Sequence, residues 1–104
     1  MAEVSVNERM TMSTRLVLSV LLENPDRELH GYEIARLTGP PVATIYSVLE
    51  RQAERGRLTV RIEDRGETGT MRPLRKYYRL TAEGEALAQR VRVPVPGTPD
   101  RRGS

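Results

Sequence analysis

Residues 29–81 pass from helical to strand-like periodicity, and this order constrains the fold more than any other feature of the sequence. Two short segments with helical spacing come first, and the break Gly39-Pro40-Pro41 separates them. Glycine suits the residue just after a helix and proline suits the first turn of the next one. The break therefore predicts two helices joined by a tight turn. Two alternating, basic segments follow, and they predict a β-hairpin of two strands.

The first helix is expected to lie inside the fold. Thr11 or Ser13 can cap its start, and almost every residue in the segment 16–22 is apolar, which predicts burial on most of its circumference. Asn24-Pro25-Asp26 ends this helix, because proline cannot continue a helix and restrains the residue before it.

Unlike the first helix, the second and third helices are each expected to have one buried side. The second is predicted over about residues 31–38, with a buried side made of Tyr32, Ile34, Ala35 and Leu37. The third is predicted over about residues 42–55 and ends at Gly56. One of its arcs is apolar, with Tyr46 at the edge: Val42, Ile45, Val48, Leu49 and Ala53. The opposite arc is small and hydrogen-bonding near its start and acidic towards its end: Ala43, Thr44, Ser47, Arg51 and Glu54.

The hairpin follows directly. Residues 58–63 alternate apolar and polar side chains, which is typical of a half-buried strand, and residues 75–80 form the returning strand. The segment 64–74 between them contains Gly66, Gly69 and Pro73, and it is expected to be a long flexible tip. Thr81 can cap a last helix over about residues 82–93.

These elements predict a mainly helical α+β fold, a winged helix-turn-helix with three helices, a two-stranded wing and a short C-terminal helix. The domain is expected to span residues 11–93. Residues 1–10 are expected to be a flexible arm, and the proline-rich residues 94–104 a disordered tail.

Composition excludes several classes of protein. A chain of 104 residues fits one domain, and without Phe or Trp its core must be aliphatic. The absence of Cys excludes disulfides and thiolate chemistry. His30 is the lone histidine and offers neither a metal site nor a catalytic pair, so no enzyme, metal or cofactor is expected. No apolar run could span a bilayer and no signal peptide is evident, so we expect a cytoplasmic protein.

The net charge of +3 is unevenly distributed along the chain. Residues 1–50 hold four Arg and seven acids, a balance of −3, whereas residues 51–79 hold nine Lys or Arg and four acids, a balance of +5. A basic surface in the second region would suit phosphate groups, although a solvated basic face explains the same pattern.

Four motifs in order give a resemblance to a known family. They are Leu29-His30-Gly31-Tyr32-Glu33-Ile34, Thr44-Ile45-Tyr46 with Leu49 and Arg51, Arg55-Gly56-Arg57-Leu58, and Arg75-Lys76-Tyr77-Tyr78-Arg79-Leu80-Thr81. Over about residues 14–90 the sequence resembles the PadR family of winged-helix transcriptional regulators. The resemblance implies a sequence-specific DNA-binding regulator, a repressor that binds a palindromic operator as a homodimer.

The sequence departs from the family pattern at two places. Family members usually build the dimer with long C-terminal helices, whereas here about twelve residues follow Thr81 before Pro94. The expected dimer would therefore depend on the first helix together with the short last one. The family's ligand pocket borders the dimerisation helices, which argues against a small-molecule effector. Pro41 also stands where the third helix usually has a capping Ser or Thr.

Double-stranded DNA is the expected partner. The residues expected to contact it are Tyr32, Ala43, Thr44, Tyr46, Ser47, Arg51, Arg72, Arg75 and Lys76. Thr44, Ser47 and Arg51 would meet base edges or phosphates from the third helix, and Ala43 a thymine methyl group. The two tyrosines would contact phosphates, and the three basic residues of the hairpin would lie along the backbone or in the minor groove.

Each of these expectations has an alternative. The polar helix face could be merely solvated, the tyrosines could serve packing only, and the basic hairpin could be a mobile loop. At the level of function, the alternatives are an architectural DNA-binding protein of excisionase type and a winged-helix module that binds proteins.

Overall fold

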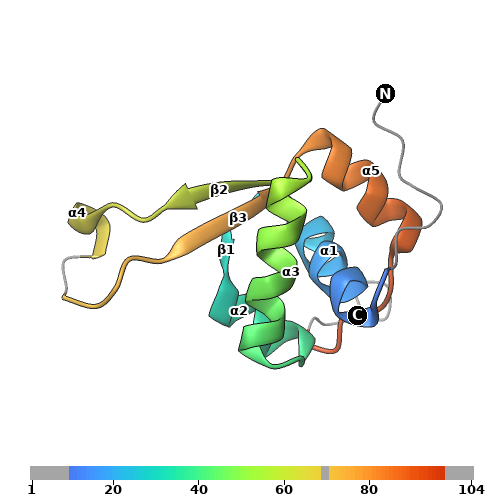
Figure 1. Ribbon diagram of the computed structural model, residues 1–104, viewed down its shortest axis with the longest axis horizontal. Coiled ribbons are helices and arrows are strands. Elements are labelled where there is room, and N and C mark those ends of the chain that lie inside the picture. Colours follow the sequence, from blue (N-terminus) through green and yellow to red (C-terminus); the bar gives the residue numbers. More distant parts are fainter. Residues whose placement is uncertain (1–9, 69–70, 98–104) are drawn as a thin grey trace.

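The computed structural model describes residues 10–68 and 71–97, and it confirms the predicted winged helix-turn-helix (Figure 1). Its elements in chain order are α1 (Met12–Glu23), β1 (Leu29–His30), α2 (Gly31–Thr38), α3 (Val42–Glu54), β2 (Leu58–Ile62), α4 (Arg65–Thr68), β3 (Lys76–Leu80) and α5 (Ala82–Val91). The remaining residues, including positions 1–9 of the expected N-terminal arm, lie outside the described part.

Local capping signals set where three of the helices begin. The side chains of Thr11, His30 and Thr81 accept hydrogen bonds from the backbone N–H groups of the first turns of α1, α2 and α5, respectively. These bonds satisfy donors that have no partner inside the helix. Helix α3 differs, because its N-cap is Pro41 and no side chain caps it.

The core lies between α1, α3 and the base of the sheet. Helix α1 is buried on most of its circumference, as predicted, with Val17, Leu18 and Val20 fully buried. Ile45 and Leu49 contribute the apolar side of α3, and Tyr78 of β3 is 2% exposed. This aliphatic cluster fixes which side of α3 faces outward.

The antiparallel sheet has the strand order β1-β3-β2, so it has one strand more than predicted. The added strand β1 is two residues long, and it pairs Leu29 with Tyr78 and His30 with Tyr77. On the other side of β3, β2 pairs over its whole length, from Leu58 opposite Leu80 to Ile62 opposite Lys76. Short segments such as β1 carry too few alternating residues to be recognised from the sequence alone.

We call residues 58–80 the wing. Figure 1 shows that β2 and β3 run away from the helices as an arm, with α4 near its far end. Helix α4 is a single turn within the segment 64–74, which was expected to be a flexible tip. Its presence corrects that expectation.

Two further expectations were wrong in part. Tyr32, expected on the buried side of α2, has 63% of its surface exposed, because the ring of Tyr46 lies against Gly31 and occupies the space beside the start of the helix. The segment 94–97, expected to be disordered, packs on the body: Val95 is buried and the N–H of Gly97 donates to the carbonyl of Leu37 at 2.8 Å. Residues 98–104 of the expected tail lie outside the described part.

Candidate nucleic-acid interface

The outward face of α3 is formed by the residues predicted from its periodicity. Ala43, Thr44, Ser47 and Arg51 are all exposed. The opposite side is held in the core by Ile45, Val48 and Leu49, so these four side chains are available to a partner. No side chain caps the first turn of α3, and its backbone N–H groups are therefore left for water or another acceptor.

An aromatic pair lies where α2 begins. The rings of Tyr32 and Tyr46 meet edge to face with their centroids 6.1 Å apart. A Cβ on Gly31 would lie 2.5 Å from the Tyr46 ring, so glycine is needed for this approach. Tyr46 is half-buried and Tyr32 is exposed, which places one hydroxyl at the edge of the core and one ring in solvent.

Arg75 of the wing is electrostatically close to this aromatic pair. Burial raises the pKa of the Tyr46 hydroxyl and nearby Tyr32 adds to the effect, whereas the positive charge of Arg75 lowers it. Burial also lowers the pKa of His30, and Arg75 lowers it further. The charge of Arg75 thus lowers the pKa of both Tyr46 and His30, two residues that are distant from it in sequence.

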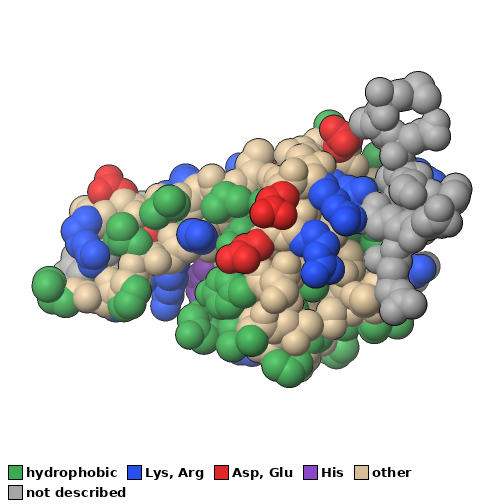
Figure 2. Space-filling view, in the orientation of Figure 1, with side chains coloured by type: hydrophobic (Ala, Val, Ile, Leu, Met, Phe, Trp, Pro, Cys, Tyr) green, Lys and Arg blue, Asp and Glu red, His purple; other side chains and the backbone are tan. Residues whose placement is uncertain are grey.

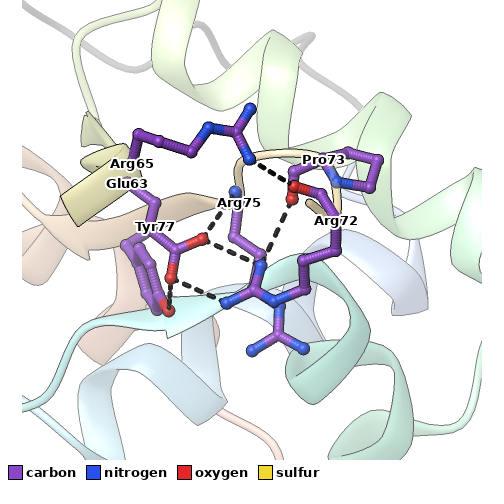
Figure 3. Close-up of polar contacts among 6 residues, drawn as sticks. All are labelled: Glu63, Arg65, Arg72, Pro73, Arg75 and Tyr77. Carbon is purple, nitrogen blue, oxygen red and sulfur yellow. Dashed lines mark hydrogen bonds and ion pairs between the residues drawn. The ribbon is translucent and has the colours of Figure 1, made fainter. Parts of the chain in front are cut away.

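The tip of the wing is built around the carboxylate of Glu63 (Figure 3). Arg72 donates to its two oxygens at 2.8 and 2.9 Å, the backbone N–H of Arg75 donates at 3.2 Å and the Tyr77 hydroxyl at 3.2 Å. The hydrogen bond from Arg72 is the main reason that the pKa of Glu63 falls from 4.5 to about 2. Arg65 closes the tip by donating to the carbonyl of Arg72 at 2.8 Å.

This network changes the role expected of Arg72. Its guanidinium forms an ion pair with Glu63 and also donates to the carbonyl of Pro73 at 3.2 Å, so its contacts hold the tip together. Arg75 and Lys76, by contrast, are exposed. The predicted site residues thus separate into an outward face on α3, an aromatic pair at α2 and two exposed cations on the wing.

A second set of contacts ties the wing to the body. The guanidinium carbon of Arg61 lies 5.0 Å from the centroid of the Tyr77 ring, and that ring meets His30 at 5.7 Å. The Nε of Arg61 also lies 2.9 Å from both carboxylate oxygens of Glu28. Strand pairing places Arg61, Tyr77 and His30 side by side across the sheet.

Sequence reasoning missed Glu63, Tyr77 and His30 as residues that shape the interface. Glu63 ends the alternating strand that precedes the loop. The available signal was its position at the closing end of a hairpin whose returning strand is basic. His30 lies at the start of α2, where its Nδ1 accepts from the N–H of Glu33 at 3.3 Å.

Among the described residues, no three His, Asp or Glu side chains gather in a way that could hold a metal ion. Within residues 10–68 and 71–97, no helix has the length and apolar character needed to cross a membrane.

Comparison with known proteins gives a likeness of structure. No family model matches the sequence, and no curated protein matches it. Among solved structures, the chain is similar to PadR of Bacillus subtilis, whose crystal structure is in complex with operator DNA. The TM-score is 0.64 at 20% identity, and the match covers 92% of this chain and 56% of the PadR chain. The chain thus has the fold of that protein and spans little more than half of its length.

Proposed function

We propose that this protein is a sequence-specific DNA-binding transcriptional regulator. The observation that carries the proposal is the outward face of α3, where Thr44, Ser47 and Arg51 are exposed, together with the exposed cations Arg75 and Lys76 of the wing. Residues 51–79, which include most of the wing, have a charge balance of +5. A likeness in fold to a regulator crystallised with operator DNA supports the same function.

In this proposal α3 lies in the major groove with its N-terminal end first. Thr44 and Ser47 meet base edges or phosphates near that end, and Arg51 reaches a guanine edge. Arg75, Lys76 and the hydroxyl of Tyr46 bind phosphates, with Tyr32 beside them, while Ala43 is small enough to approach a thymine methyl group. Arg72 acts on the DNA mainly by keeping the wing in shape.

We propose further that the protein represses by occupying promoter DNA as a homodimer on a palindromic operator. In the described residues, α1 and α5 expose little apolar surface for the expected dimer interface. Helix α1 is mostly buried, and the exposed side of α5 is polar, with Glu83, Glu85, Gln89 and Arg90.

The test begins with selection of bound duplexes from a random library, followed by fluorescence anisotropy at two salt concentrations. Arg51→Ala should lose preference for the selected duplex over a scrambled one. Arg75→Ala/Lys76→Ala should weaken binding to both duplexes equally and reduce the slope of log K against log salt by about 2 for each protomer bound, since each phosphate contact contributes about 0.9. Arg92→Ala, an exposed residue after the end of α5, is the matched control and should leave both properties unchanged.

The outcomes separate the candidate functions. Preference for an inverted repeat with two chains per duplex supports a dimeric regulator. Equal affinity for all duplexes, or a requirement for direct repeats, favours an architectural DNA-binding protein. No binding to any duplex would contradict both and leave a protein-interaction module.

A further inference from the structure

Exposed hydrophobic side chains are concentrated on the wing. Six large hydrophobic residues are exposed in the described part of the chain, and four of them lie on the wing: Val60 (43%), Ile62 (61%), Met71 (95%) and Leu74 (39%). In Figure 2, hydrophobic side chains cover much of the visible face of the wing, interspersed with Lys and Arg. Apolar groups gathered on a protruding element usually mark a contact surface.

Strand register places part of this set on one face. Val60 lies opposite Tyr78 and Ile62 opposite Lys76 in the pairing of β2 with β3. Residues two apart on a strand, and residues paired across strands, point to the same face, so Val60 and Ile62 share the face of Lys76. Tyr78 fills the core at the base of the wing, where it is 2% exposed. The apolar face therefore begins in the core, continues outward beyond it and ends near a basic residue.

The wing tip is held in shape from within. The carboxylate of Glu63 accepts from two nitrogens of Arg72, from the Tyr77 hydroxyl and from the backbone of Arg75. Met71 directly precedes Arg72, so the chain is anchored one residue from the most exposed hydrophobic side chain. A backbone that is already anchored at the tip loses little further conformational freedom on binding.

We infer that Met71 inserts from the minor groove between two base pairs and kinks the duplex, with Leu74 and Ile62 packing against the deoxyribose edges. This inference rests on the proposed function, and it names the surface that DNA would meet on the wing. Charge complementarity selects DNA over an apolar protein partner, because residues 51–79 carry a balance of +5 and Lys76 is exposed on the same face of the wing as Ile62. Methionine, leucine and isoleucine are among the side chains that unstack base steps in kinked complexes.

The two kinds of contact have different signatures. Cations release counterions when they neutralise phosphates, so their loss changes the salt dependence of binding. Met71 carries no charge, and its loss should change the shape of the DNA and leave the salt dependence intact. A kink also favours flexible pyrimidine–purine steps at the insertion point, which the protein would prefer without hydrogen bonds to their bases.

The experiment uses a duplex recovered by the selection described above, labelled at both ends for energy transfer and carrying 2-aminopurine at successive positions near one end of the footprint. The wild-type protein should shorten the end-to-end distance and raise 2-aminopurine fluorescence at one step. Met71→Ala should abolish both signals and weaken binding about tenfold, with an unchanged salt slope. Val60→Ala, on the same wing and 43% exposed but with no DNA contact assigned to it, is the matched control and should still bend and unstack the duplex.

Three results would overturn the inference. If Met71→Ala binds with wild-type bending and fluorescence, the insertion is wrong while the proposed function stands. If the wild-type protein binds without bending or unstacking the DNA, the same conclusion follows. If the wild-type protein binds no duplex at all, the proposed function fails and this inference fails with it. Circular dichroism spectra and melting temperatures equal to those of wild type would show that Met71→Ala is folded.

Discussion

In the helical body the buried side chains are mostly aliphatic, with a few small or amide side chains such as Ser19 and Gln52, whereas at the tip of the wing the buried side chain is the carboxylate of Glu63, only 6% exposed. The reverse holds at the surface, because the wing exposes Ile62 and Met71 while the outer side of α5 is polar. Hydrophobic burial thus stabilises the body, and directional polar contacts hold the wing tip. A region whose shape depends on few polar contacts can keep its apolar side chains outside for a partner.

The first prediction, with the largest expected effect, tests whether apolar side chains stabilise the body but not the wing. Leu49→Ala should lower the free energy of unfolding by about 3 kcal/mol, because it empties a fully buried position in α3. Ile62→Ala on the wing should change it by less than about 0.5 kcal/mol, since that side chain is 61% exposed. Chemical denaturation of both variants measures the difference. Equal losses would show that the apolar wing residues belong to the same core.

A second prediction compares how tightly the backbone is packed in the body and in the wing, by replacing one glycine in each. Gly84→Ala in α5 should cost about 1–3 kcal/mol, because the new Cβ would collide with the backbone oxygen of Arg57. Gly66→Ala in α4 has ordinary space, with Asp64 Oδ1 the nearest atom at 3.7 Å, and alanine is about 1 kcal/mol better than glycine within a helix. Thermal denaturation should therefore show a large fall for the body variant and no fall for the wing variant. A stabilised Gly84→Ala protein would contradict the close packing of α5 on residue 57.

A third prediction concerns acid, which should loosen the wing tip through Glu63. Its pKa falls from 4.5 to about 2 in the folded protein, so its contribution to stability is complete above pH 4.5 and is lost as the pH falls through about 2. Glu63→Gln should remove this dependence and, at pH values where wild-type Glu63 is ionised, weaken the Arg72 contacts. NMR shifts of the Arg75 amide, which donates to Glu63, report the change.

The control for this titration is Glu54→Gln, an exposed residue at the end of α3. It should leave the pH dependence of the wing amides as in wild type. If the Arg75 amide of the wild-type protein titrates near pH 4.5, Glu63 is not ion-paired in solution and the tip is looser than its contacts indicate.

The body was predictable from the sequence because its signals are local. Gly39-Pro40-Pro41 separates α2 from α3, and Thr81 marks the start of α5, as the structure confirms. The periodicity of α3 likewise identified Thr44 and Ser47 as outward residues, since a helix needs only its own spacing to define a face.

The wing tip was not predictable because its contacts are not local. Glu63 and Arg72 are nine residues apart and meet only once the hairpin closes, so Arg72 had the same appearance as any solvent-exposed cation of a basic loop. The segment 94–97 shows the same limit. Its proline-rich composition suggested disorder, but a hydrogen bond from Gly97 to Leu37, far away in sequence, orders it.

The smallest expected effect lies on α3, the part of the body that would share the DNA surface with the wing. Glu50 is exposed near the middle of this helix, and its charge raises the pKa of Tyr78 in β3 together with burial, the main cause, and Tyr46. A negative charge between the helix and the wing should repel phosphates, although solvent screens it strongly. Glu50→Gln should therefore tighten binding to a scrambled duplex about twofold, an effect of the size that exposed charge pairs contribute. Asp26→Asn, exposed in the turn after α1, is the matched control and should have no effect on anisotropy titrations. Weaker binding by Glu50→Gln would instead indicate that Glu50 accepts a hydrogen bond from a base, and Glu50 would then join Ser47 and Arg51 among the groove-facing residues of α3.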